Sequence, residues 1–171
     1  AMTATIKAGE TIFMTSKNTR EKGQIILDKT GIETGSDLWN DNYSLAGNTF
    51  AIRKDSPTGE IVQEMTTDEK GHAETPKEIA NALELGTYYV TETKASNGFV
   101  NTFKAVKVEL KYANQTVALV TSNIKGQNQE ITGETTLIKE DKDTGDKTQG
   151  RAVFEGTEYT LFTAKDGKAV K

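Results

Sequence analysis

Two segments of the chain, 110 residues apart, share one sequence pattern. GQIILDKTGIETG begins at Gly23 and GETTLIKEDKDTG at Gly133; each has a Leu before a Lys and ends in Thr-Gly six residues after that Lys. A fixed period of this kind indicates repeated modules. We therefore expect a complete module over 23–126, a linker over 127–132 and the opening strands of a second, truncated module over 133–171. Residues 1–22 are interpreted as the end strand of a preceding module or as a linker.

The 171 residues include 15 Gly and two Pro, and short runs rich in Val, Ile, Thr, Tyr and Phe lie between Gly, Asn, Asp and Ser. Runs of this kind, bounded by turn residues, are typical of β-strands. Seven candidate strands follow from the pattern, and this number favours an all-β sandwich. They are TIFMT from Thr11, QIILDK from Gln24, NTFAIRK from Asn48, EIVQEM from Glu60, TYYVTET from Thr87, FKAVKVEL from Phe103 and TVALVTSN from Thr116.

One connection has the signals of a short helix. Thr75 is a candidate N-cap, Pro76 suits the first helical position and Glu78 suits the third. Ile79 and Leu83 are four residues apart, which would place them on one helical face. The pattern predicts a helix from Pro76 to about residue 84.

Composition excludes several kinds of chemistry. The chain has no Cys and a single His, so thiolate catalysis, disulfides and multi-histidine metal sites are not expected. The net charge is -4, without the basic excess that nucleic-acid binding requires. His72 has no second candidate ligand beside it, and the acidic run from Glu140 to Asp146 lacks the oxygen ligands of a calcium loop. We expect no metal, no cofactor and no nucleic-acid partner, and no apolar run is long enough for membrane insertion of this segment.

Three polar residues lie in phase with the apolar residues of their predicted strands: Lys29, Glu92 and Asn123. Because side chains alternate between the faces of a strand, this phase would direct them toward the core. The alternative is that these residues lie at strand ends and reach solvent.

The string GTYYVTETKASNGF from Gly86 resembles the G-x-Y-x-x-x-E-T-x-A-P-x-G-Y box of the Cna B-type domains, which occur in Gram-positive surface adhesins and pilins. An ILDK strand precedes it and a strand ending in Asn follows it, as in that family. Ser96 stands in place of the usual Pro, and Phe99 in place of the usual Tyr. The loop from Ser36 to Ala46 is longer than the family pattern.

The resemblance implies an immunoglobulin-like or prealbumin-like sandwich stabilised by an intramolecular isopeptide bond. Carried over by position, the bond would join Lys29 to Asn123, with Glu92 as the catalytic acid and base. Burial would keep the lysine amine neutral and the carboxyl protonated, so that the amine could attack the amide once and release ammonia. Lys139 corresponds to Lys29 in the second module and has no partners there. The protein would then be no enzyme beyond this single event.

The same resemblance implies a stalk module of an extracellular, cell-wall-attached surface protein, with neighbouring modules of that protein as its partners. Two alternatives remain open. One is a ligand-binding adhesin domain, in which Trp39 and Tyr43 or the region of Asn81 contact a host extracellular-matrix protein. A hydrolase on an all-β scaffold is the other alternative, although the sequence offers no pair of nucleophile and base.

Overall fold

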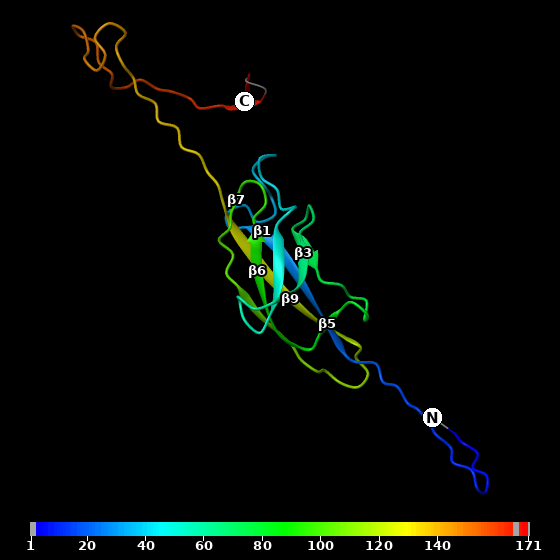
Figure 1. Cartoon of the computed structure of the whole chain (residues 1–171). Coiled ribbons are helices and arrows are strands. Elements are labelled where there is room, and N and C mark those ends of the chain that lie inside the picture. The colour runs from blue at the N-terminus through cyan, green and yellow to red at the C-terminus, as the bar shows by residue number, and fades with distance from the viewer. Residues whose placement is uncertain (1–2, 166–167, 171) are drawn as a thin grey trace. The chain divides into compact units, whose positions relative to one another are not determined.

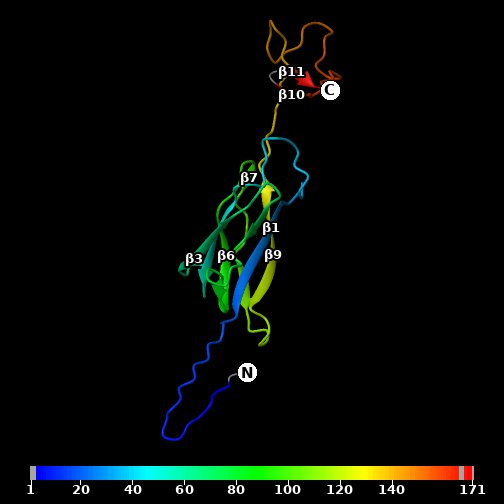
Figure 2. The same ribbon diagram turned by 90° about the vertical axis from the view of Figure 1, so that its right-hand side faces the viewer.

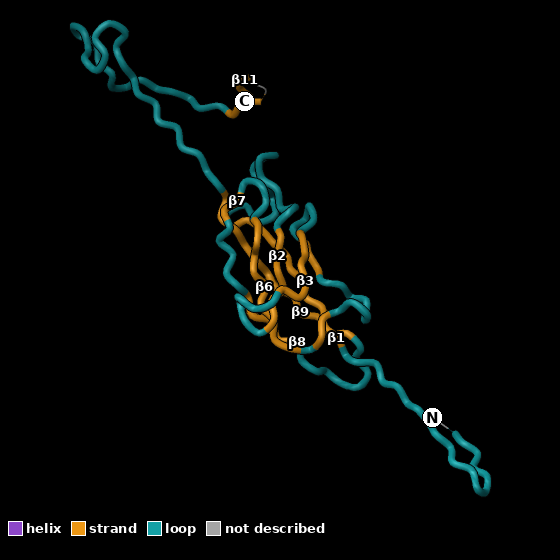
Figure 3. Tube along the Cα trace, in the orientation of Figure 1, coloured by secondary structure: helices purple, strands orange, loops and turns teal. Residues whose placement is uncertain are grey.

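The computed structural model describes residues 3–165 and 168–170. They divide into two compact units, Ala1–Ile131 and Thr132–Lys171. Among the described residues the first unit consists of strands and loops, without a helix (Figure 3). Its strands are β1 (Lys22–Gly31), β2 (Thr49–Lys54), β3 (Ile61–Thr66), β4 (His72–Glu74), β5 (Leu83–Glu84), β6 (Gly86–Lys94), β7 (Phe99–Val100), β8 (Val106–Leu110) and β9 (Leu119–Glu130).

These strands form the two sheets of a sandwich, as the sequence predicted. The first sheet has the order β4-β1-β9-β7, and β5 also pairs with β1. The second sheet has the order β3-β2-β6-β8, with antiparallel pairs throughout. Alternation along the strands explains the two layers, because every second side chain of β1 and β6 is buried while its neighbours are more exposed.

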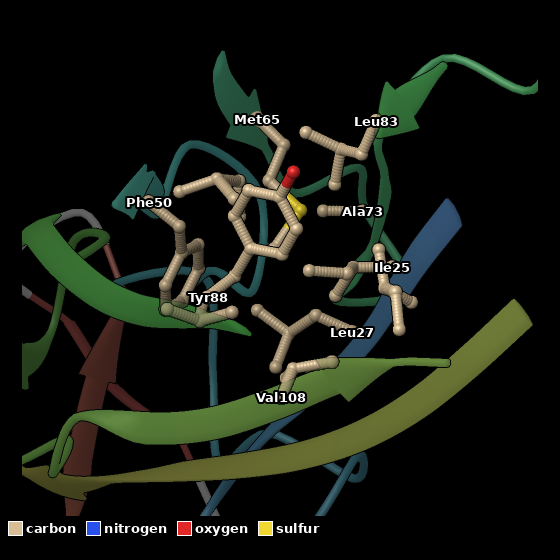
Figure 4. Close-up of a cluster of buried hydrophobic side chains, with 11 residues drawn as sticks. Ile25, Leu27, Phe50, Met65, Ala73, Leu83, Tyr88 and Val108 are labelled. Carbon is tan, nitrogen blue, oxygen red and sulfur yellow. The ribbon is translucent and has the colours of Figure 1, made fainter. Parts of the chain in front are cut away.

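The core lies between the two sheets. Ile25 and Leu27 of β1 meet Phe50, Tyr88 and Val108 of the second sheet, and Figure 4 shows these side chains converging. Met65, Ala73 and Leu83 extend the same cluster toward the edge strands. Removing this apolar surface from water, at roughly 25 cal/mol per Å², is the main favourable contribution to folding.

The first and last strands of the unit lie side by side and run in the same direction (Figures 1 and 2). Their parallel pairing is continuous from Lys22 opposite Leu119 to Gly31 opposite Asn128. Because the side-chain period of a strand is two, this register decides which residues of β9 face the core. Ile124, Gly126, Asn128 and Glu130 share the inner face, and the residues between them are more exposed.

The predicted helix after Thr75 is wrong: the described chain makes only a single turn there, in which the Ala82 N–H donates to the Glu78 carbonyl. The capping hydroxyl of Thr75 instead accepts a hydrogen bond from the Ile25 N–H, and Ile25 also accepts from the Thr75 N–H. After this turn the chain becomes extended again at β5, which pairs with β1. Tertiary pairing with β1 therefore overrides a local helix signal.

Three strand predictions also need correction. Residues 11–15 form no strand and are exposed. The strand predicted from Phe103 begins only at Val106, and the one predicted from Thr116 begins at Leu119. β9 runs to Glu130, beyond the expected module end at Gly126. Its polar second half, KGQNQE, has the composition of a linker.

In the second unit, the strands within the described residues are β10 (Thr163–Lys165) and β11 (Lys168–Val170), which pair as an antiparallel hairpin. Asp141 and Gly145 bridge across a tight turn, as Gly31 and Gly35 do in the first unit. Leu137, Tyr159 and Leu161 are exposed. Nowhere in residues 3–165 or 168–170 is there a helix that could cross a membrane.

Candidate functional site

Lys29 is buried inside the sandwich. It follows Ile25 and Leu27 on the inner face of β1, and its side chain is 1% exposed. Its Nζ has no hydrogen-bond partner in the structure. The ring of Phe103 lies next to it, with Nζ 5.9 Å from the ring centroid. A buried amine without a partner is costly and rare, so this residue is a candidate for chemistry.

Glu92 approaches the same point from the opposite sheet. It is on the inner face of β6, in phase with Tyr88 and Val90, and its side chain is fully buried. Its Oε1 lies 3.9 Å from Lys29 Nζ. Both of its carboxyl oxygens lie 2.9 Å from Nδ2 of Asn128, which belongs to β9 and is 1% exposed. The three side chains thus join the first strand, the last strand and the second sheet.

Burial perturbs the amine and the carboxyl in opposite directions. Desolvation lowers the pKa of Lys29 to about 8, against the opposing attraction of Glu92 and Glu130. Desolvation also raises the pKa of Glu92, although the Asn128 hydrogen bond and Lys29 oppose it. Both shifts favour the neutral forms, which are the forms that aminolysis of an amide requires.

The amide of Asn128 is held at both ends. Its Oδ1 accepts a hydrogen bond from the Thr102 backbone N–H at 3.1 Å, while its Nδ2 faces Glu92. In the structure the carbonyl is bound by a main-chain donor and the carboxyl lies at the amide nitrogen, which is the group that would leave as ammonia.

Asn123 is not part of this cluster. It lies opposite Ile26 in the ladder, on the outer face of β9, and its side chain is exposed. Residues five apart on a strand point to opposite faces, so Asn123 and Asn128 cannot both face Lys29. The structure therefore places Asn128, and not the predicted acceptor Asn123, beside the predicted Lys29 and Glu92.

The internal repeat contained the signal for Asn128. Asn128 stands eleven residues before Lys139, and Asn18 stands eleven residues before Lys29. The 110-residue period therefore matches Asn18 with Asn128 as it matches Lys29 with Lys139. Applied to the asparagines, the period would have selected Asn128 over Asn123.

A second buried carboxyl ties the ends of β1 and β9 together. Glu130 Oε1 accepts hydrogen bonds from the N–H of Glu33 at 3.1 Å and from the N–H and hydroxyl of Thr34, both at 2.8 Å. Burial alone would raise its pKa, but these hydrogen bonds outweigh it and the pKa is lowered. A Cβ at Gly31 would clash with Glu130 Oε1 and Thr34 Oγ1, so a side chain at this position would displace the carboxylate from its hydrogen bonds. The hydrogen bonds of Glu130 thus help to fix the register of β9 against β1 just beyond Lys29 and Asn128.

The long loop after β1 closes one end of the sandwich. Trp39 packs edge-on against Tyr43, and Tyr43 against Phe99, with ring centroids 5.2 and 5.9 Å apart. Tyr43 donates to the Ile131 carbonyl at 2.6 Å.

Ser96, which replaces the proline of the box, donates its N–H to buried Asn48 at 2.9 Å, and a proline has no N–H to donate. The substitution therefore anchors the loop.

The other residues considered from the sequence lie apart from this cluster. His72 is partly exposed, and its Nδ1 lies 2.9 Å from Asp28 Oδ1, which raises its pKa. Lys139 is exposed in the second unit. Among the described residues there is no group of three His, Cys, Asp or Glu side chains that could hold a metal ion.

The fold is a two-sheet sandwich in which a buried Lys on the first strand and a buried Asn on the last strand meet a buried Glu from the second sheet. The chain matches the SpaA prealbumin-like fold domain over residues 23–125. It therefore belongs to this family, and the resemblance inferred from the box at Gly86 is confirmed. No curated protein matches the chain.

Three solved structures with similar folds illustrate the likeness. The Bacillus anthracis TIE protein is 24% identical, with a TM-score of 0.44 over 63% of this chain and 17% of its own. BcpA, the major pilin subunit of Bacillus cereus, is 28% identical, with a TM-score of 0.41 over 62% of this chain and 29% of its own. The major pilin SpaD of Corynebacterium diphtheriae is 25% identical, with a TM-score of 0.43 over 64% and 30%. The chain thus spans less than a third of each of these proteins.

Proposed function

We propose that the chain is a structural stalk module of an extracellular, cell-wall-attached surface protein of the pilin or adhesin type, and that one isopeptide bond between Lys29 and Asn128 stabilises it. The observation that carries the proposal is the buried Lys29 amine, which has no hydrogen-bond partner and lies beside a carboxyl that binds the Asn128 amide. Membership of the SpaA family supports the stalk role. Neighbouring modules of the same protein are its expected partners.

The reaction uses only residues of this chain. Neutral Lys29 Nζ attacks Cγ of Asn128, and the Thr102 N–H stabilises the negative charge that develops on Oδ1. Glu92 gives its proton to Nδ2 and takes one from Nζ, so that the C–N bond to Nδ2 breaks and ammonia leaves. One amide replaces another, one ammonia is lost and Glu92 ends in its starting form.

The amine is available at neutral pH. With a pKa of about 8, roughly one Lys29 in ten is uncharged at pH 7, far more than for an exposed lysine. Holding amine and amide in one cavity supplies a high effective molarity, which compensates for the low reactivity of an amide. The event occurs once per chain, so the module has no turnover.

Intact-protein mass spectrometry tests the proposal. The mass should fall below the sequence mass by one ammonia, and a digest should contain a peptide linking Lys29 to Asn128. The Glu92→Gln variant should keep the full sequence mass, because glutamine cannot exchange the two protons. An unchanged mass for the wild-type chain, or a crosslink through Asn123, would refute the assignment.

A further inference from the structure

Glycines face both reacting side chains across the parallel pair of strands. In the β1–β9 register Lys29 is opposite Gly126, and Asn128 is opposite Gly31. Residues opposite each other on one face of a ladder are normally side-chain neighbours. Here the residue opposite each reacting side chain is a glycine, so no neighbouring side chain projects from the partner strand.

The space above Gly126 is filled by an aromatic ring. A Cβ built on Gly126 would lie 2.5 and 2.8 Å from two ring carbons of Phe103 and 3.2 Å from Lys29 Cδ. The first two distances are shorter than real Cβ contacts allow, so any side chain at this position must displace Phe103 or the lysine. Phe103 also packs edge-on against Phe50, with ring centroids 5.2 Å apart, which limits its movement inward.

Phe103 is partly buried and packs against the core cluster. It lies in the segment between β7 and β8, outside the strand ladders. The ring covers the stem and amine of Lys29, whose side chain is 1% exposed. If the ring moves outward, water reaches Nζ and the charged form of the amine is no longer penalised.

We propose that Gly126 is a positioning residue for the crosslinking reaction. Because glycine has no side chain, the Phe103 ring can occupy the space above Gly126 and cover Lys29. This role rests on the proposed Lys29–Asn128 bond. Gly126 touches neither the amide nor the carboxyl and acts through Phe103. Glycine is thus required at this position for the reaction, because it lets the Phe103 ring keep water from the Lys29 amine.

The first test compares crosslinking rates of full chains made by cell-free synthesis, stopped in acid at intervals and analysed by intact mass. Gly126→Ala should slow the loss of ammonia on the order of tenfold or more, as small misplacements of reacting groups do. The matched control is Gly86→Ala, whose Cβ would meet only Tyr88 ring atoms at 3.8 and 3.9 Å, and which should react at the wild-type rate.

A rescue experiment separates positioning from general damage to the fold. In the Phe103→Leu background the clashing ring is absent, so adding Gly126→Ala should change the rate less than about twofold. This comparison remains decisive if the single Gly126→Ala variant fails to fold. A tenfold loss in both backgrounds, or no loss in either, would overturn the role of Gly126.

A third measurement does not depend on the bond. In the Glu92→Gln background, labelling of Lys29 by an amine reagent in the folded chain should be faster with Gly126→Ala than without it. Equal labelling rates would contradict the claim that Gly126 allows the Phe103 ring to cover Lys29, whether or not the wild-type protein loses ammonia. A wild-type chain that keeps its full mass would refute the bond and with it a role in crosslinking, and the labelling result would then show only whether Gly126 lets the Phe103 ring shield Lys29.

Discussion

The stability of the module should depend strongly on Lys29. The proposed bond closes a loop from residue 29 to residue 128 (128 minus 29, or 99 residues). By analogy with a disulfide, restricting the unfolded chain in a loop of this length contributes about 4.7 kcal/mol at 25 °C. Lys29→Met removes the bond and places an apolar side chain of similar length in the same cavity. Most of the loss should therefore come from the missing crosslink.

The expected shift in the unfolding temperature follows from the size of the unit. About 110 residues correspond to an unfolding entropy of about 0.23 kcal/mol/K, so a loss of 4.7 kcal/mol lowers Tm by about 20 °C. Scanning calorimetry of both chains measures the shift, and reducing agents should leave the wild-type value unchanged. Lys125→Met is the control, since Lys125 is exposed on the outer face of β9 and its loss should cost less than about 0.5 kcal/mol.

One result would refute this reasoning. If the wild-type mass confirms the bond and Lys29→Met still lowers Tm by less than about 5 °C, the crosslink does not act by restricting the unfolded chain. A larger effect for Lys125→Met than for Lys29→Met would likewise show that the core site is not the source of stability.

Three further predictions concern the site. Asn128→Ala should abolish the loss of ammonia, whereas Asn123→Ala should react fully; the reverse pattern in intact mass would restore the sequence-based acceptor. Burial lowers the pKa of Lys29 to about 8 from an ordinary 10.5. In an uncrosslinked Asn128→Ala chain that keeps this burial, the unfolded state should bind more protons than the folded state between these values, so stability should rise with pH across this window, by up to about 3 kcal/mol. Denaturant titrations should show no such rise once Lys29→Met is added. Lys139 should remain a free amine, and a second loss of ammonia, or a peptide crosslinked through Lys139, would contradict this.

Much of the fold follows from local patterns. Short runs of apolar and β-branched residues between turn residues identified β1, β2, β3 and β6, and buried and exposed side chains alternate most clearly in β1 and β6. The helix prediction failed because Thr75 can cap a helix or bond to a strand, and only the path of β1 decides between these partners. Contacts between residues far apart in the sequence were outside the reach of local propensity.

The sequence likewise predicted only part of the candidate site. Lys29 and Glu92, which the structure brings together, were predicted from the sequence because each ends a clear alternation on its strand and the box fixes the position of Glu92. Asn128 was missed because the second half of β9 is polar on both faces, so hydrophobic phase cannot be read there. Its inner face carries an amide and a carboxyl where a core would have apolar residues, so the binary pattern of apolar and polar residues gives no signal there.

The position of the cluster explains why a bond there suits a stalk. β1 and β9 are parallel, so the chain enters the sheet at one end of the ladder, at Lys22, and leaves it at the other, after Glu130. Tension applied through the two ends therefore shears the strands against each other. With a covalent link from Lys29 to Asn128, tension passes from β1 directly into the last residues of β9, and residues 30–127 carry none of it. A link at Asn123 would have left five more residues of β9 under tension, and its outward side chain could not have reached the buried amine.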